Sequence, residues 1–163
     1  MNNIWKFSLV LAFSIMGDQL IKGTIQSFIQ NNSDHYIIFD QIFYLVRERN
    51  YKQILGLSFF DKVLLDNYLA VVIDSILILG SLYMIIINRN KNLFLGWSYT
   101  LILSGLLTSW IDRITQGFTL NYFLFKAFDT KVTTAFGDIF FMLGILLVIF
   151  EKIRRKKNST HPF

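Results

Sequence analysis

Residues 93–114 of this chain read LFLGWSYTLILSGLLTSWIDRI. The stretch is close to the ~20 residues that an α-helix needs to cross the hydrocarbon core of a bilayer. Its charged side chains, Asp112 and Arg113, stand together at one end. An ionised side chain inside a span costs roughly 2.5–3.5 kcal/mol, so such groups are usually paired, hydrated or used. The stretch therefore predicts a membrane helix that ends in a polar site.

Three other stretches have the same character, and the four predicted spans cover residues 5–25, 68–87, 93–114 and 134–150. The chain of 163 residues is 53% hydrophobic, contains 17 Phe and has a mean hydropathy of +0.46. A soluble domain of this size cannot bury so much apolar surface. We therefore expect an all-α integral membrane fold with four transmembrane helices, forming a single domain over residues 1–163.

The basic residues predict how these helices are oriented. Lys6, Arg89, Lys91 and the basic run 152–157 all fall on one side of the predicted membrane. Cytoplasmic loops carry an excess of Lys and Arg, so both termini are expected in the cytoplasm. The net charge of +5 then comes mostly from the C-terminal tail. Anionic membrane lipids are the expected partner of this tail, and nucleic acid is not needed to explain it.

The long segments 26–67 and 115–133 are then expected on the outer side of the membrane. Residues Tyr36–Val46 are rich in Ile, Phe, Tyr and Val and follow a cluster of turn residues, which predicts extended structure and a small outer sheet. Residues 55–65 have the pattern of a short amphipathic helix lying at the membrane interface.

The cysteine and histidine content argues against a metal site. The chain has no Cys, and its two histidines, His35 and His161, are far apart and without ligand spacing. No metal and no other cofactor is expected.

Four carboxylates lie near the helix ends that should face away from the cytoplasm: Asp18, Asp74, Asp112 and Asp138. Four acids at one depth predict a shared polar pocket. Asp18 precedes Lys22 by four residues, so the two side chains share one helix face and can neutralise each other. This pair either fixes the first helix against its neighbours or contacts a substrate or lipid.

The other acids differ in what surrounds them. Asp74 could pair with Lys22 or Arg113, or exchange a proton with water, and the sequence does not choose between these. Asp138 has no Lys or Arg within four residues, so any partner must come from another element. A carboxyl group in this position is a candidate general acid or base.

The third predicted helix carries small and polar residues on one face. Gly105, Ser109 and Asp112 share this face, where small residues allow close helix contact. Asp112 and Arg113 are predicted to have a structural role, with the guanidinium bonding loop carbonyls or carboxylates.

Several motifs resemble those of bacterial lipoprotein signal peptidase, also called signal peptidase II. The family motif Asp-Gln-x-x-Lys is matched in full by DQLIK at Asp18–Lys22. The motif Arg-Asn-x-Gly-x-x-x-Gly is approximated by RNYKQILG at Arg49–Gly56, which includes Asn50 but has a lysine at one glycine position. The motif Gly-Gly-x-x-Gly-Asn-x-x-Asp-Arg is matched in part by SGLLTSWIDR at Ser104–Arg113, with Ser109 at the asparagine position.

The resemblance is incomplete at the two catalytic aspartates of that family. Its motif Gly-x-Val-Val-Asp-Phe corresponds to GFTLNY at Gly117–Tyr122, which places Asn121 at the first aspartate. Its motif Asn-x-Ala-Asp corresponds to AFGD, which retains the second aspartate as Asp138 and has Ala135 at the asparagine position.

The resemblance implies four transmembrane helices, an outer β-cradle with a short helix, and an aspartic dyad that cuts signal peptides from lipid-modified precursors. In such a dyad two carboxyl groups exchange protons with water and the scissile carbonyl. An amide cannot accept and return a proton near neutral pH. General acid–base catalysis contributes roughly 10²–10⁴-fold, so an asparagine should nearly silence the reaction.

The favoured interpretation is a divergent family member in the bacterial cytoplasmic (inner) membrane. It would bind lipid-modified precursors, their signal peptides or a peptide ligand such as an antibiotic, without efficient cleavage. Two alternatives remain open: an active peptidase in which Asp138 works with another acid such as Asp74 or Asp129, and a structural or assembly subunit of a membrane complex. The predicted site comprises Asp138 and Asn121 at the catalytic positions, with a surrounding pocket formed by Asp18, Lys22, Asn50, Ser109, Asp112 and Arg113.

Overall fold

The computed structural model describes residues 4–29, 35–39, 43–51, 63–127 and 130–159. Its elements, in chain order, are α1 (Ile4–Phe28), β1 (His35–Phe39), β2 (Phe43–Asn50), α2 (Val63–Asn88), α3 (Leu93–Gln116), β3 (Thr119–Ala127), β4 (Thr130–Thr134) and α4 (Phe136–Ser159).

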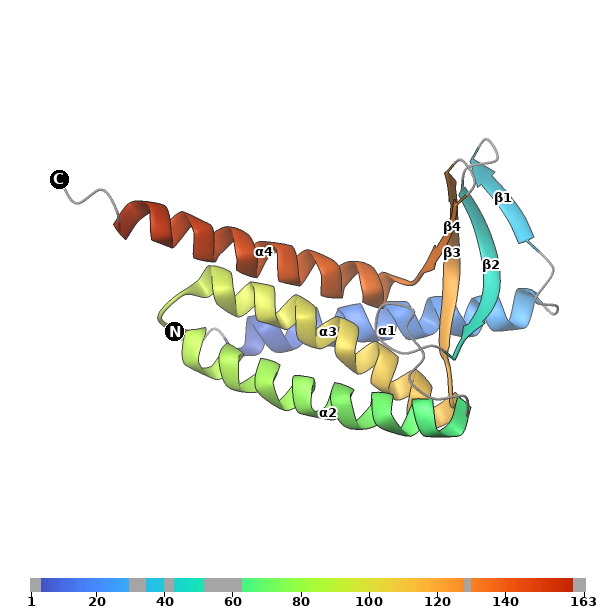
Figure 1. The fold of residues 1–163 in the computed structure, drawn as a ribbon, viewed down its shortest axis with the longest axis horizontal. Coiled ribbons are helices and arrows are strands. Elements are labelled where there is room, and N and C mark those ends of the chain that lie inside the picture. The colour runs from blue at the N-terminus through green and yellow to red at the C-terminus, as the bar shows by residue number, and fades with distance from the viewer. Residues whose placement is uncertain (1–3, 30–34, 40–42, 52–62, 128–129, 160–163) are drawn as a thin grey trace.

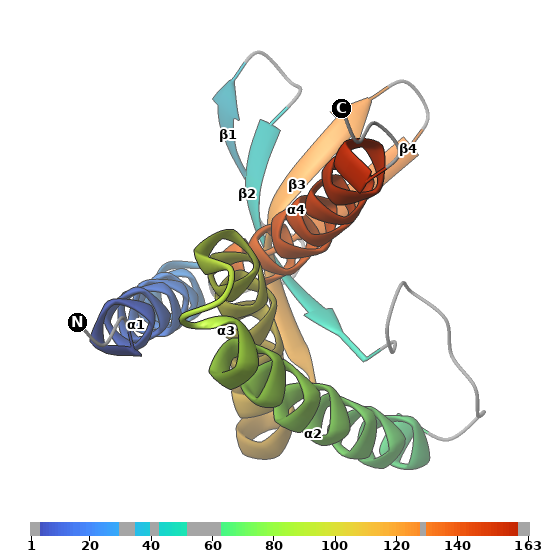
Figure 2. The same cartoon turned by 90° about the vertical axis from the view of Figure 1, so that its left-hand side faces the viewer.

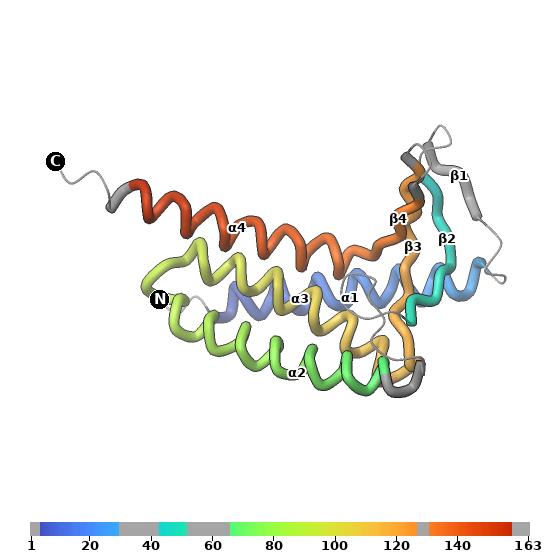
Figure 3. Tube along the Cα trace, in the orientation of Figure 1, coloured from blue at the N-terminus to red at the C-terminus, as the bar shows by residue number. Residues whose placement is uncertain are grey.

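The four helices run alongside one another, and the sheet stands across one end of them (Figure 1). The α3 helix lies at the centre and packs against α1, α2 and α4. The start of α1 and the end of α4 both lie at the end away from the sheet, as the chain trace also shows (Figure 3). The connection between α2 and α3 lies at this end too, so the basic residues Lys6, Arg89, Lys91 and 152–157 gather at one end of the bundle.

Many apolar side chains on the outside of the helices are exposed, and several charged side chains are buried between the helices, as expected for helices surrounded by lipid. Phe13, Leu79 and Leu20 are about two-thirds or more exposed. Asp18 and Asp112, by contrast, are fully buried. The sequence thus places many large apolar side chains on the surface, where a soluble protein would place charge.

Within the described residues, three helices are long and apolar enough to cross a membrane: Ile4–Phe28, Asp66–Asn88 and Leu93–Gln116. They agree with the first three predicted spans. The fourth predicted span forms α4, but charged residues bracket its apolar run 139–150. This helix begins at Phe136, two residues later than predicted, because Thr134 pairs with Phe123 in the sheet.

The sequence also sets both ends of α3. The side chain of Asn92 accepts a hydrogen bond from the Leu95 amide and caps the first turn. Gly117 ends the helix with a φ of 78°, a left-handed conformation that glycine adopts at little cost, and its amide donates to the Arg113 carbonyl. The polar end of α3 is therefore held in place directly beneath the sheet.

The sheet is fully antiparallel and has the strand order β1-β2-β3-β4. The prediction of extended structure in the first outer segment is confirmed, with β1 and β2 in place of one continuous stretch. The strands β3 and β4 in the second outer segment were not predicted. Their aromatic and β-branched residues fit a pleated, half-buried surface, and they join the second segment to the first.

The interfacial helix predicted over residues 55–65 lies mostly outside the described residues. Its last three positions, 63–65, form the backbone start of α2.

Close packing between α3 and α4 depends on glycine. A Cβ atom added at Gly105 would collide with the Gly137 carbonyl and the Phe141 side chain, and one added at Gly144 would collide with Ser98 and Ile102. The prediction that small residues on α3 permit a close helix contact is confirmed at Gly105.

Candidate functional site

The centre of the site is a lysine between two carboxylates. The Lys22 Nζ atom lies 2.5 Å from Asp18 Oδ2 and 2.7 Å from Asp112 Oδ2. All three side chains are buried, and two come from α1 while the third comes from α3. The predicted i,i+4 pair is present, and it also clamps α1 to α3.

Asp112 has two further partners from neighbouring elements. Gln19 Nε2 donates to its Oδ1 at 2.9 Å, and the backbone amide of Leu120 donates to its Oδ2 at 3.3 Å. A buried carboxylate that is fully hydrogen-bonded and ion-paired avoids most of its desolvation cost. Asp112 therefore ties α1 and β3 to the polar end of α3.

Tyr122 connects this cluster to α4. Its hydroxyl donates to Asp18 Oδ1 at 2.8 Å and accepts from the Phe136 amide at 2.9 Å. The Gly137 amide also donates to Asp18 Oδ1, at 3.3 Å. The first amides of a helix have no partner within it, so here side chains from β3 and α1 satisfy the start of α4.

The Tyr122 hydroxyl stays protonated in this position. Burial raises the pKa of Tyr122 well above its ordinary value, and the nearby Asp18 carboxylate raises the pKa further. The sequence analysis did not predict a role for Tyr122. Its position directly after Asn121, in a segment rich in strand-forming residues, could have indicated one.

Asp138 lies in the first turn of α4. Its Oδ2 accepts hydrogen bonds from the Ala135 amide at 3.1 Å and from the Thr134 hydroxyl at 3.4 Å. An acid at the third helical position that reaches back to the preceding amide forms one half of a capping box. Ala135 has no side chain with which to form the other half.

Asn121 lies on β3, next to the strand that leads into α4. It is buried, and its Nδ2 donates to the carbonyl of Thr133 at 3.2 Å and to the hydroxyl of Thr133 at 3.3 Å. Thr133 and Thr134 are neighbours on β4, so both predicted catalytic positions are anchored to the same strand.

The second cation of the site, Arg113, pairs with Asp74. Arg113 Nε lies 3.6 Å from Asp74 Oδ2, and both side chains are buried. Of the partners that the sequence left open for Asp74, the structure selects Arg113. Arg113 also interacts electrostatically with Asp112 and Asp138, and Lys22 with Asp138, so all four carboxylates lie within the field of these two cations.

The remaining predicted residues lie beside this cluster. Ser109 is half-buried on α3, one turn before Asp112. Asn50 ends β2, where its carbonyl accepts a hydrogen bond from the Thr119 hydroxyl at 3.3 Å. The structure therefore gathers six of the eight predicted residues into one network of charges and sheet contacts, with these two at its edge.

The four carboxylates of the site differ in their partners. Lys22 and Arg113 hold three of the carboxylates directly, whereas Asp138 is bonded to a backbone amide and a hydroxyl. A carboxyl group without a direct cation partner is the one best able to take up and release a proton. Asp138 is thus the one of the four carboxylates to which the described residues offer no salt bridge.

Comparisons with known proteins bear on the family to which this chain belongs. A family model described as signal peptidase (SPase) II matches residues 10–154. Two proteins named lipoprotein signal peptidase, from Streptococcus thermophilus strains CNRZ 1066 and ATCC BAA-250 / LMG 18311, are each 28% identical to this chain over 96 residues. The matched part is 59% of this chain and 62% of each relative's length.

Two solved structures, both described as a bacterial membrane enzyme determined by the in meso method, share the fold. The structure at 2.3 Å resolution has a TM-score of 0.85 and 20% identity, over 98% of this chain and 94% of its own. The structure at 1.9 Å resolution has a TM-score of 0.76 and 20% identity, over 91% and 92%. Since the family model covers most of its length, this chain belongs to the signal peptidase II family.

Proposed function

We propose that this lipoprotein signal peptidase-like membrane protein binds lipid-modified precursor proteins, their signal peptides or a similar peptide ligand, and does not cleave them efficiently. The observation that carries the proposal is the amide of Asn121, which stands at the family position of a catalytic aspartate and donates to Thr133.

The direction of these hydrogen bonds matters for the chemistry. The carbonyl oxygen of Thr133 can only accept, so the group at position 121 must donate. An ionised carboxylate there would face this oxygen at close range and lose the hydrogen bond. The Thr133 carbonyl therefore suits an amide or a protonated carboxyl group at position 121, but not an ionised one.

A second departure from the family pattern supports the same proposal. Ala135 stands where the family has an asparagine that can cap α4 and orient the neighbouring acid. Here Asp138 bonds the Ala135 amide itself, so the only carboxyl group at the two catalytic positions also serves as a helix cap.

The family positions that keep their side chains favour a site that is still in use. The family positions Asp18, Lys22, Asp112 and Arg113 keep their side chains, and all four are buried in ion pairs. Breaking a buried pair typically costs about 3–5 kcal/mol, so the network holds the pocket in one shape. We place the protein in the bacterial cytoplasmic (inner) membrane with four spans and both termini inside.

The test uses the purified full chain and a precursor peptide bearing a diacylglyceryl group. Binding is measured by fluorescence and cleavage by mass spectrometry of the products. The natural chain should bind without appreciable cleavage. Asn121→Asp, which restores two carboxyl groups able to share a proton, should raise cleavage by about 10²-fold or more. Asn121→Ala is the matched control and should change cleavage little.

Two further variants allow for an incomplete rescue. Ser109→Asn and Ala135→Asn, added to Asn121→Asp, restore the amides expected by the family pattern. Failure of this triple variant to cleave a precursor that it binds would mean that these three positions are not the cause of the lost cleavage, and efficient cleavage by the natural chain would contradict the proposal itself.

The alternatives give different results. Cleavage by the natural chain that is lost in Asp138→Ala but kept in Asn121→Ala would establish an active peptidase with another acid. Asp74 is engaged with Arg113, which weakens it as that acid, and Asp129 lies outside the described residues. Absence of binding by every variant would establish a structural role.

A further inference from the structure

The α1 and α2 helices leave an apolar groove between them, at the end of the bundle opposite the candidate site. Each packs on α3, but they hardly touch each other. Viewed along the bundle, they lie on different sides of α3 (Figure 2). The groove has a volume of about 140 Å³, with α3 as its floor.

The lining of the groove is almost entirely hydrocarbon. Phe7 and Leu11 come from α1, Leu82 and Ile86 from α2, and Leu103 from α3. A cavity of roughly this size lined by such residues stays free of water and accepts apolar molecules. In a membrane protein, a groove of this kind is open to hydrocarbon chains of the surrounding lipid.

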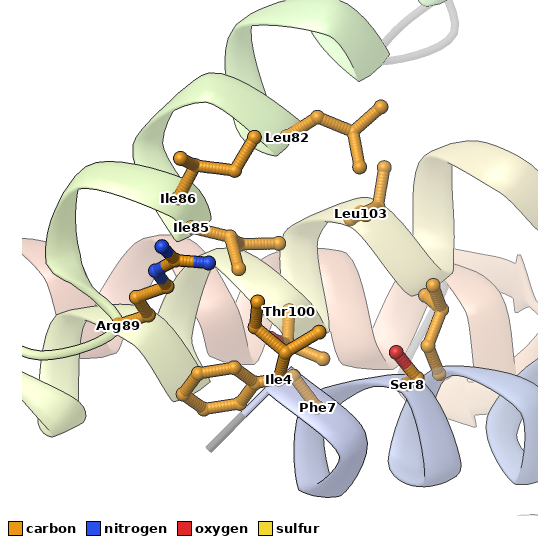
Figure 4. Close-up of a pocket in the computed structure, with 10 residues that line it drawn as sticks. Ile4, Phe7, Ser8, Leu82, Ile85, Ile86, Arg89, Thr100 and Leu103 are labelled. Carbon is orange, nitrogen blue, oxygen red and sulfur yellow. The ribbon is translucent and has the colours of Figure 1, made fainter. Parts of the chain in front are cut away.

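One charged side chain lies at the end of this lining. Arg89, directly after α2, is half-buried and lines the groove, where its guanidinium lies on the side of Ile85 and Ile86 (Figure 4). In the described part of the chain, no acidic side chain forms an ion pair with Arg89.

Among the described residues, the acidic side chain at this end of the bundle is already paired with other residues. Glu151 accepts from Asn92 at 2.8 Å and pairs with Arg154 at 2.8 Å and Arg155 at 3.1 Å. A guanidinium that is half-buried beside an apolar surface favours an anion that presents two acceptor oxygens to its N–H groups, such as a phosphodiester.

We propose that this groove binds one anionic glycerophospholipid, with an acyl chain against α3 and the phosphate on Arg89. The occupant must be both apolar and anionic, because hydrocarbon and an unneutralised cation lie within the same groove. Free phosphate lacks the first property and a neutral lipid lacks the second. This lipid site does not depend on the function proposed for the candidate functional site around Lys22.

The test measures lipid binding to the purified full chain in detergent by native mass spectrometry and thermal unfolding. The probes are phosphatidylglycerol, phosphatidylcholine with the same acyl chains, and inorganic phosphate. Phosphatidylglycerol should bind and raise the unfolding temperature, while phosphatidylcholine should bind at least about tenfold more weakly. Inorganic phosphate should have no effect.

Two pairs of variants separate a defined site from general attraction. Arg89→Gln should weaken phosphatidylglycerol binding at least about tenfold, whereas Lys91→Gln, an equal loss of charge on an exposed neighbour, should change it less than about twofold. Ser8→Phe places a ring in the groove and should also weaken binding. Leu9→Phe, on the exposed side of α1, should not.

Several results would overturn the proposal. Equal losses of phosphatidylglycerol binding in Arg89→Gln and Lys91→Gln would mean that the overall positive charge at this end of the bundle attracts the lipid, without a defined site at Arg89. Unchanged binding in Ser8→Phe would mean that the acyl chain lies elsewhere, and this variant decides the matter even if Arg89→Gln does not fold. A molecular mass of two chains, or displacement of the lipid by the apolar helix of a precursor, would identify a protein occupant instead.

Discussion

The hydroxyl oxygen of Thr108 occupies the space that a Cβ atom at position 137 would need, so glycine is required at Gly137. The family motifs have these two positions the other way round, with glycine at the position of Thr108 and alanine at that of Gly137. The two departures lie on opposite sides of one contact between α3 and α4, so we expect their effects on stability to be coupled.

This coupling predicts a compensating pair of substitutions. Gly137→Ala should destabilise the protein by about 1–3 kcal/mol, because a methyl group is forced into a filled space. Thr108→Ala should recover much of that loss by removing the hydroxyl. The measurement is unfolding in detergent for the full mutant cycle, and the control is Gly144→Ala, whose clash is with Ser98 and Ile102. Equal rescue of both glycine variants by Thr108→Ala would contradict the coupling.

The Asp74–Arg113 pair predicts a second non-additive result. Asp74→Ala should cost about 3 kcal/mol or more, because it leaves the Arg113 guanidinium buried without this partner. Asp74→Leu combined with Arg113→Met should cost less than either single change, since it removes both charges. Additive losses in this cycle, measured by unfolding, would show that the two side chains act separately.

Tyr122 predicts a dependence of stability on alkaline pH. Burial raises the pKa of Tyr122 above its ordinary value near 10, so the folded state holds this proton more tightly than the unfolded state. Its contribution is complete below pH 10 and is lost as pH rises above 10.

Tyr122→Phe tests this link directly. The variant loses hydrogen bonds to Asp18 and to the Phe136 amide, so it should be less stable by about 1–3 kcal/mol at pH 7. Above pH 10 its unfolding temperature should fall less steeply than that of the natural chain. Tyr83→Phe, on an exposed part of α2, is the matched control and should follow the natural chain.

The proposed topology can be checked with reporter fusions. Reporters placed after Lys91 and after Lys157 should indicate the cytoplasm, and a reporter after Lys126 on β3 should indicate the outer side. A cytoplasmic signal at Lys126 together with one at Lys157 would mean that α4 does not cross the membrane.

The sequence alone predicted the helices and the local pairs well, because both depend on short spacings. The Asp18–Lys22 pair follows from i,i+4 spacing, and the apolar runs follow from the thickness of a bilayer. The start of α4 was predicted two residues early, since no periodicity reveals that Thr134 pairs in a sheet.

The long-range contacts that assemble the site could not be predicted from short sequence spacings. The bond from Tyr122 to Asp18 joins residues that are 104 positions apart, and that from Gln19 to Asp112 joins residues 93 apart. Local patterns carry no information on which distant groups meet. The same is true of Asp74, whose partner the sequence left open and the fold selects.

The capping of α4 has a consequence for how the protein is made. A ribosome releases α1 first and α4 last, yet the amides that begin α4 are completed by Asp18 of α1 and by Tyr122. The first amides of α4 therefore lack these hydrogen-bond partners until α1 and β3 lie beside them. Folding of this part of the chain thus depends on a contact between a helix that is synthesised earlier and one that is synthesised later, so α1 must keep Asp18 available until α4 has formed.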